Sequence, residues 1–232
     1  MDSGMVNVAL PTIMRSFHLS LQSAKFVVTL YLLTITVTLV FWGRLADRLG
    51  RGNIYLGGMA LFAVGACGCS LAPGYDKLLV SRFVQALGAS MMMSSGPAII
   101  KTAFPSAHLG RSLGLVGIAT ACGLLTGPFV SGLLISMFSW RSIFVVTLPV
   151  AMFALACGKI FLMEHLGRRN EGGEVAYDWK GSVCWVVIVI LSLRIFQSVD
   201  HFLSLVNLLM VIVLALAIYL FFTIEKDSIS PI

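Results

Sequence analysis

An arginine inside an apolar segment is the first candidate for chemistry in this sequence. The string LLVSRFVQALGAS, residues 78–90, carries Arg82 among apolar side chains and Gln85 three positions later. A helix places residues i and i+3 on one face, so Arg82 and Gln85 share a face. At 1.5 Å per residue, Arg82 lies about 8 Å below the outer end of the helix. An ionised side chain at membrane depth is costly, so it indicates function by default. The structural alternative is that Arg82 snorkels to the outer headgroups.

A second candidate is a short polar string, GRLADRLGRG, which begins at Gly43. Its glycines, Gly50 among them, permit a tight turn and a close helix approach. Asp47 can pair with an arginine such as Arg48 or Arg51 and with the positive end of a helix dipole. This chemistry predicts a latch between helices. A plain cationic anchor would need only Arg or Lys, without the Gly and Asp spacing.

The third candidate is GLLTGPFVSG, residues 123–132, in another apolar segment. A Gly127-Pro128 pair within a helix kinks it and frees backbone carbonyls. Small residues at i and i+4, such as Gly123 and Gly127, together with Gly132, allow close helix packing. Taken alone, this pattern fits any kinked membrane helix.

Membrane helices must position these residues. The chain has 232 residues, 58% of them hydrophobic and 11% charged, against about 45–50% and about 25% in soluble domains. That composition excludes a soluble globular domain and a disordered chain. Apolar runs of about 20 residues predict helices, since backbone groups in lipid must bond within their own segment. The predicted spans are residues 24–42, 54–72, 78–100, 113–138, 143–163, 181–197 and 203–224.

The segment 1–13 is apolar but too short to span a bilayer. It is interpreted as the outer half of a helix. We therefore expect that the chain begins further upstream or that this product is truncated.

The cationic residues predict the orientation, because Lys and Arg concentrate in cytoplasmic loops. Alternate connections hold two unequal sets. The smaller set is Arg15, Lys25, Lys77 and Arg141, and the larger is Arg44, Arg48, Arg51, Lys101, Arg111, Lys159, Arg168, Arg169, Lys180 and Lys226. We predict a multi-pass protein of the plasma membrane with a cytoplasmic C-terminus. The charges are spread over separate loops facing lipid headgroups, which argues against nucleic-acid binding.

All three strings resemble motifs of the major facilitator superfamily. The string GRLADRLGRG resembles G-x-L-x-D-R-x-G-R-[KR], with Gly52 in the last place. This resemblance implies that Asp47 and the neighbouring arginines and glycines gate the cytoplasmic side. The string LLVSRFVQALGAS resembles R-x-x-Q-G-x-G-[AG], with Ala86 for one glycine, and this resemblance implies that Arg82 takes part in proton coupling. The third resembles the antiporter motif G-x-x-x-G-P-x-x-G-G of exporters, with Ser131 for one glycine. The stretch WRSIF from Trp140 matches the part that follows in the same family.

The first segment narrows the resemblance. MDSGMVNVALP, residues 1–11, resembles the string L-D-x-T-[IV]-V-N-V-A-L-P of the 14-helix drug:proton antiporters, with Gly4 for the threonine. The resemblance implies that Asp2 is the membrane-embedded aspartate, about 13 Å along the helix from Pro11 and within approach of Arg82. A carboxylate beside a cation can exchange its proton as a solute binds, as coupling requires. The alternative is a polar residue at an exposed N-terminus.

This resemblance implies the domain plan. Residues 1–163 are expected to form an all-α N-terminal six-helix bundle, 164–180 a cytoplasmic linker, 181–224 two linker helices, and 225–232 a cytoplasmic tail. The second six-helix bundle of the family is expected to be absent. The predicted partners are then a missing C-terminal half or a second copy in a homodimer.

A substrate cavity is predicted beside the second span. Tyr31, Thr34 and Thr38 share one helix face by their spacing, and Gln85 and Met92 lie on the fourth span. Methionine suits promiscuous apolar recognition. The alternative is that these residues bridge helices and fill gaps.

The resulting hypothesis is a transporter, without a cofactor, for proton-coupled efflux of amphiphilic drug-like compounds. The first alternative is a truncated, non-transporting half that is inert or needs a partner. An importer of the same superfamily is disfavoured by the Gly127-Pro128 motif. An enzyme has no support, because the sequence shows no His-rich metal cluster, nucleophile elbow or phosphate loop.

Overall fold

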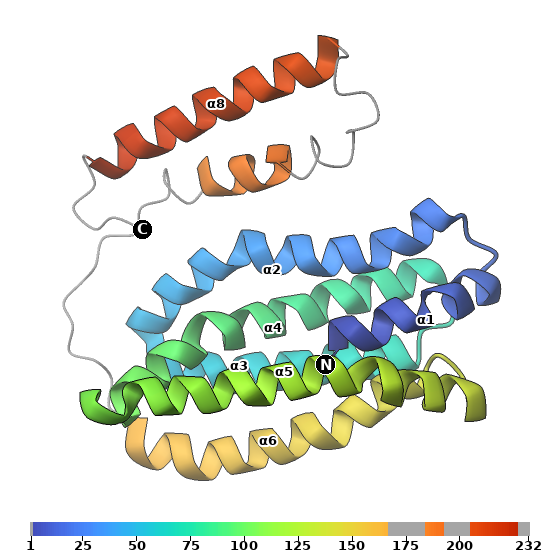
Figure 1. The fold of residues 1–232 in the computed structure, drawn as a ribbon, viewed down its shortest axis with the longest axis horizontal. Coiled ribbons are helices and arrows are strands. Elements are labelled where there is room, and N and C mark those ends of the chain that lie inside the picture. Colours follow the sequence, from blue (N-terminus) through green and yellow to red (C-terminus); the bar gives the residue numbers. More distant parts are fainter. Residues whose placement is uncertain (1, 167–183, 193–204, 227–232) are drawn as a thin grey trace.

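The computed structural model describes residues 2–166, 184–192 and 205–226, and every regular element in these ranges is helical. The all-α prediction is therefore confirmed (Figure 1). The helices are α1 (Asp2–Ser16), α2 (Leu21–Leu49), α3 (Arg51–Ser70), α4 (Tyr75–Ala103), α5 (Ser106–Met137), α6 (Ser142–Leu166), the stretch 184–192 and α8 (Leu205–Lys226).

Helices α2 to α6 are long and apolar enough to cross a membrane, the last over Ser142–Ile160. Each contains most of one predicted span, but several continue further. Helix α2 runs past its apolar run to Leu49, because backbone hydrogen bonding continues through polar residues that favour helix. The ends of the predicted span 181–197, most of the linker 164–180 and most of the tail 225–232 lie outside the described residues.

Glycine and serine mark the ends of α2. Ser20 caps its N-terminus, where the Ser20 hydroxyl accepts a hydrogen bond from the Ser23 backbone N–H. Gly50 alone separates α2 from α3, with φ +93° and ψ 126°. Side-chain-bearing residues rarely adopt this conformation, so the sharp turn between the two helices depends on a glycine at this position.

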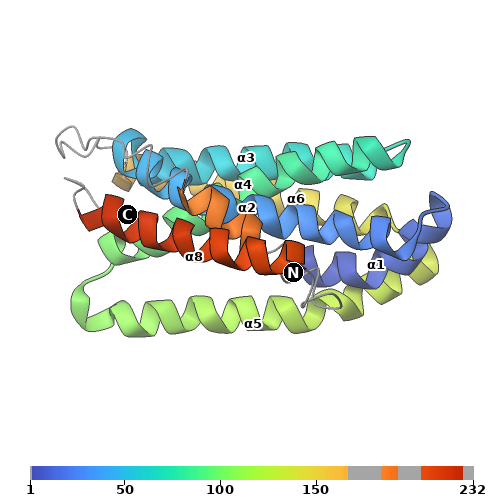
Figure 2. The same cartoon turned by 90° about the horizontal axis from the view of Figure 1, so that it is seen from above.

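Helices α1 to α6 form one elongated bundle whose axes follow a common direction (Figures 1 and 2). The most extensive contact joins α3 to α4, while α2 packs on α4, α3 on α6 and α1 on α5. A buried cluster joins Met5, Val6 and Ile13 of α1 to Trp140 in the α5–α6 connection and Phe144 at the start of α6. Side chains far apart in the sequence therefore make the core at one end of the bundle.

The stretch 184–192 and α8 lie on the α2 side of the bundle (Figure 1). The Trp185 indole N–H donates to the Thr36 carbonyl of α2 at 3.3 Å. The Trp185 ring also lies 6.3 Å from the ring of Phe221 in α8. One tryptophan thus contacts both the bundle and α8.

Candidate functional site

Arg82, Asp2 and Gln85 form a closed hydrogen-bonded triangle inside the bundle. The Arg82 Nη1 atom donates to Asp2 Oδ2 and to Gln85 Oε1, each at 2.8 Å. The Gln85 Nε2 atom donates to Asp2 Oδ1 at 3.0 Å. Arg82 and Gln85 are fully buried, and the Asp2 side chain is 11% exposed. Arg82 therefore does not extend to the outer headgroups, and the structure brings together the three residues that the sequence singled out.

Two aromatic rings flank the guanidinium of Arg82. Its Cζ atom lies 4.1 Å from the centroid of the Tyr31 ring and 5.7 Å from that of Phe144. The Arg82 Nε and Nη2 atoms have no hydrogen-bond partner among the described residues. Hydrogen bonding to the buried cation is thus concentrated on Nη1, where Asp2 supplies the negative charge.

The crossing of α3 and α4 positions Gln85. A Cβ atom added to Gly65 would overlap the backbone of Gln85, and one added to Gly88 would overlap the backbone of Phe62 and Gly58. Glycine at these positions allows the two backbones to touch. Because Gln85 lies at the contact, the close approach holds it against α3 while it reaches Asp2.

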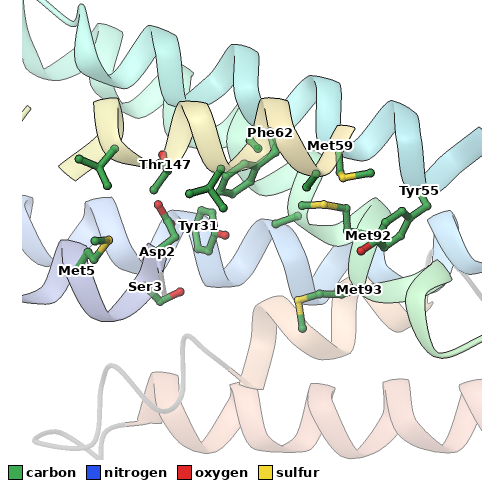
Figure 3. A pocket seen from close by; sticks show the side chains of 15 residues that line it. Asp2, Ser3, Met5, Tyr31, Tyr55, Met59, Phe62, Met92, Met93 and Thr147 are labelled. Atoms are coloured by element: carbon green, nitrogen blue, oxygen red, sulfur yellow. The ribbon is translucent and has the colours of Figure 1, made fainter. Parts of the chain in front are cut away.

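A pocket of about 410 Å³ opens beside the triangle (Figure 3). Asp2 is the charged residue of its lining, and it lies beside Tyr31 in the close view. The remaining lining is rich in sulfur and aromatic groups. The lining residues are Asp2, Ser3, Met5, Tyr31, Tyr55, Met59, Phe62, Ala89, Met92, Met93, Val146, Thr147, Val150, Ala151 and Ala154.

The residues predicted to line a cavity divide into two groups. Tyr31 and Met92 line this pocket, whereas Thr34, Thr38 and Gln85 do not. The Thr34 hydroxyl bonds its own helix at Leu30. The Thr38 hydroxyl lies 2.9 Å from the Ser90 hydroxyl of α4, so it joins two helices, as in the alternative interpretation. Gln85 lies behind Asp2, as a partner of the carboxylate.

The loop predicted to act as a latch contains an ion pair. Arg51, the first residue of α3, bonds Asp47 near the end of α2 at 2.9 Å, with half of the Asp47 side chain exposed. Gly43 lies next to α4, where an added Cβ would be 3.9 Å from the Ser94 Cβ. Gly50 makes the turn through its positive φ, and Arg48 lies in the last turn of α2. The predicted gating role of these residues stays a prediction.

The Gly-Pro motif of α5 lies against α1. The helix is continuous through Pro128, and a Cβ added to Gly4 would contact Pro128 Cδ at 3.4 Å. The fully buried Ser131 hydroxyl donates to the Met5 carbonyl of α1 at 2.8 Å. Gly4 and Ser131, two of the four positions at which this chain departs from the motifs, thus both lie in the contact between α1 and α5.

The other motif glycines of α5 differ in their surroundings. Gly127 is buried, and Gly123 and Gly132 are half-buried. A Cβ added to Gly132 would meet nothing within 4 Å. Close packing in this motif is therefore centred on Gly127 and Ser131.

A cluster at the α5–α6 connection has no role predicted from the sequence. Trp140 is 1% exposed, and its indole N–H donates to the Ser16 hydroxyl at 3.1 Å. Arg141 covers the Trp140 ring at 4.4 Å and donates to the Ala72 carbonyl at 2.9 Å. Phe144 then extends from Trp140 toward Arg82. The sequence feature that could have indicated this cluster is the Trp140-Arg141 pair in a short connection between two apolar segments.

Within the described ranges, no group of three or more His, Cys, Asp or Glu residues is placed to hold a metal ion. The groups gathered at the site are one carboxylate, one guanidinium, one amide and the largely apolar lining of the pocket.

The sequence model of the Major Facilitator Superfamily matches residues 1–227. The chain is 33% identical over 176 residues to the riboflavin transporter RibZ of Clostridioides difficile, covering 75% of this chain and 39% of RibZ. It is 35% identical over 190 residues to the multidrug resistance protein Stp of Mycobacterium tuberculosis, covering 82% of this chain and 35% of Stp. The methylenomycin A resistance protein of Streptomyces coelicolor is 38% identical over 159 residues, covering 67% of this chain and 33% of that protein. The matches thus span 33–39% of the length of these relatives.

Proposed function

Because the chain belongs to the Major Facilitator Superfamily and is a multi-pass membrane protein, we propose that it serves proton-coupled efflux of amphiphilic compounds. We place it with the 14-helix drug:proton antiporters, in the plasma membrane. Relatives named for multidrug and antibiotic resistance support an efflux role, and the family indicates transport in place of catalysis.

The observation that carries this proposal is the position of Asp2. Its carboxylate bonds the buried Arg82 on one side and lines the pocket on the other. Charged groups at membrane depth mark proton and solute pathways. A carboxylate with both contacts can exchange its partner: Arg82 in one state, and a proton or a cationic solute in another.

The coupling follows from competition for Asp2. When Asp2 pairs with Arg82, its charge is satisfied and the pocket holds no free carboxylate. When a proton binds Asp2, the attraction to Arg82 weakens, and a cationic solute loses its counter-charge. Proton binding and solute binding then exclude each other at one carboxylate, which is the requirement for exchange in opposite directions.

The pocket supports an amphiphilic solute. Met5, Met59, Met92 and Met93 provide adaptable apolar contacts, and Tyr31 adds an aromatic face. An apolar lining with a single carboxylate favours a flat, lipophilic cation.

The cytoplasmic loop supplies the proposed gate. The Asp47–Arg51 pair and the Gly50 turn lie where α2 passes to α3. An exposed ion pair is weak, so it can open and close as the bundle moves against a second body. This second body is proposed as a C-terminal half or another copy of the chain.

Proton-driven movement of ethidium tests the proposal, with the chain reconstituted in vesicles. Asp2→Asn is expected to reduce ethidium transport roughly tenfold or more, because one partner of a buried pair is removed. Asp76→Asn removes the same charge from an exposed position at the start of α4 and should transport as the wild type does. Equal rates in wild type and Asp2→Asn would refute the coupling role. Absence of ethidium transport by the wild type, alone and with a second half supplied, would favour the non-transporting alternative.

Riboflavin is a second candidate solute, favoured by the likeness to RibZ. Tyr31, Tyr55 and Phe62 in the pocket lining suit a flat ring system. Riboflavin is neutral at pH 7, so its binding should survive Asp2→Asn, whereas ethidium binding should not. Binding of each compound to the purified chain, followed by fluorescence, separates the two candidates.

A further inference from the structure

Burial of the Arg82 cation is energetically costly, and the proposed exchange at Asp2 increases that cost. The side chain is fully buried, and its Nε and Nη2 atoms have no hydrogen-bond partner among the described residues. Its Nη1 atom bonds only Asp2 and Gln85 among those residues. Whenever a proton or solute occupies Asp2, a buried cation is left with a neutral amide as its remaining hydrogen-bond partner. Buried charges without compensation are strongly destabilising.

We propose that Tyr31 and Phe144 form an aromatic cage that stabilises Arg82 while Asp2 is released. This inference rests on the proposed exchange at Asp2 and deepens it. The two rings come from α2 and α6, and their centroids lie 4.1 and 5.7 Å from the Arg82 Cζ atom. Both distances lie within the range, about 6 Å, over which a cation is attracted to a ring face. The attraction does not depend on the charge of Asp2.

The Phe144 side of the cage is held independently of Asp2. Phe144 is fully buried and meets the Trp140 ring edge-on, with centroids 6.2 Å apart. Trp140 is fixed in turn by its hydrogen bond to Ser16 and by Arg141 above its ring. The ring near Arg82 is therefore positioned by the α5–α6 connection and not by the carboxylate.

The two rings of the cage differ in whether a solute can contact them. Tyr31 lines the pocket, whereas Phe144 does not. A solute can contact Tyr31 directly, so changes at Tyr31 mix solute contact with the effect on Arg82. Phe144 does not line the pocket, so its proposed effect on a solute runs through Arg82, and it is a positioning residue. It is consequently the cleaner site for a test.

The first experiment is a thermal unfolding cycle on the full chain in detergent, and it requires no transport. Phe144→Leu is measured in the wild-type background and in Asp2→Asn. If the cage carries the cation once the carboxylate is neutral, Phe144→Leu lowers Tm by about 4 °C more in Asp2→Asn than in the wild type. Equal losses in both backgrounds would overturn the cage.

Two controls separate the cage from general packing. Ile143→Val is a control change at a neighbour that is 1% exposed and belongs to the same core cluster. It should lower Tm by the same amount in the wild-type and Asp2→Asn backgrounds. In an Arg82→Met background no cation remains, so the dependence of Phe144→Leu on Asp2→Asn should vanish. If the dependence persists there, it arises from packing and the inference is wrong.

Binding to the purified chain adds a readout that packing would not move. Ethidium must displace Arg82 from Asp2, so Phe144→Leu should weaken ethidium binding by on the order of tenfold. Nile red, a neutral dye, should bind unchanged, as should both dyes to Ile143→Val. Equal weakening of both dyes would contradict the cage. If the wild type binds no ethidium, the proposed function fails, and the unfolding cycle still decides whether the cage exists.

Discussion

At the scale of single residues, the site depends on how a buried guanidinium is compensated. Arg82 is removed from solvent and forms a closed triangle with Asp2 and Gln85. Ion pairs of this kind contribute little net stability, but breaking one costs about 3–5 kcal/mol. When a proton or a solute binds a carboxylate that is shared between such a cation and a pocket, the ion pair breaks. This binding can therefore shift the conformational equilibrium of the molecule.

Another single-residue feature is the backbone of Gly50. Its φ of +93° and ψ of 126° lie in a region that essentially only glycine occupies. We expect Gly50→Ala to lower the free energy of unfolding by about 1–3 kcal/mol, measured by thermal unfolding in detergent. Gly74→Ala is the control, because Gly74 has φ −153° and open space around it. If the two alanine variants unfold alike, backbone strain does not account for the glycine.

At the scale of elements, the α3–α4 crossing determines where the side chains of the triangle lie. Gly65 and Gly88 allow backbone contact between the helices, and Arg82 and Gln85 belong to α4. The spacing of Arg82 and Gln85 alone predicts that they share one helix face, and the structure shows them bonded together. The spacing could not reveal that α3 lies directly behind Gln85, because that contact joins residues from different helices.

This crossing is testable with a matched pair of glycines in helices. Gly88→Ala should destabilise the protein by roughly 1–3 kcal/mol, since the new Cβ would overlap the backbone of α3. Gly117→Ala, in α5, introduces the same methyl group where nothing lies within 4 Å. Alanine favours helix over glycine, so this variant should be as stable as the wild type or more so. Thermal unfolding of both variants is the measurement, and a Gly88→Ala variant of wild-type stability would contradict the close approach.

At the scale of the whole molecule, the charge distribution predicts the orientation in the membrane. Lys77 lies near the start of α4 and Lys101 near its end, and both are exposed. They belong to the predicted outer and cytoplasmic sets, respectively.

We expect a membrane-impermeant maleimide to label Lys77→Cys in intact cells. Lys101→Cys should be labelled only after permeabilisation. The unmodified chain is the reference for its native cysteines, two of which, Cys67 and Cys122, are exposed. The reverse pattern of labelling would invert the topology.

The sequence alone determined the helical, membrane-spanning character and the family motifs, because apolar runs and short motifs are local properties. The tertiary structure decided which side chains meet. Tyr31 lines the pocket and contacts Arg82, while the Thr38 hydroxyl bonds α4. Trp140 and Phe144, without an assigned role in the sequence, became supports of the buried charge. Membrane helices are apolar on most faces, so their sequences do not mark the inner one. Close contacts between distant segments decide how each helix is rotated, and through that rotation which residues form the site.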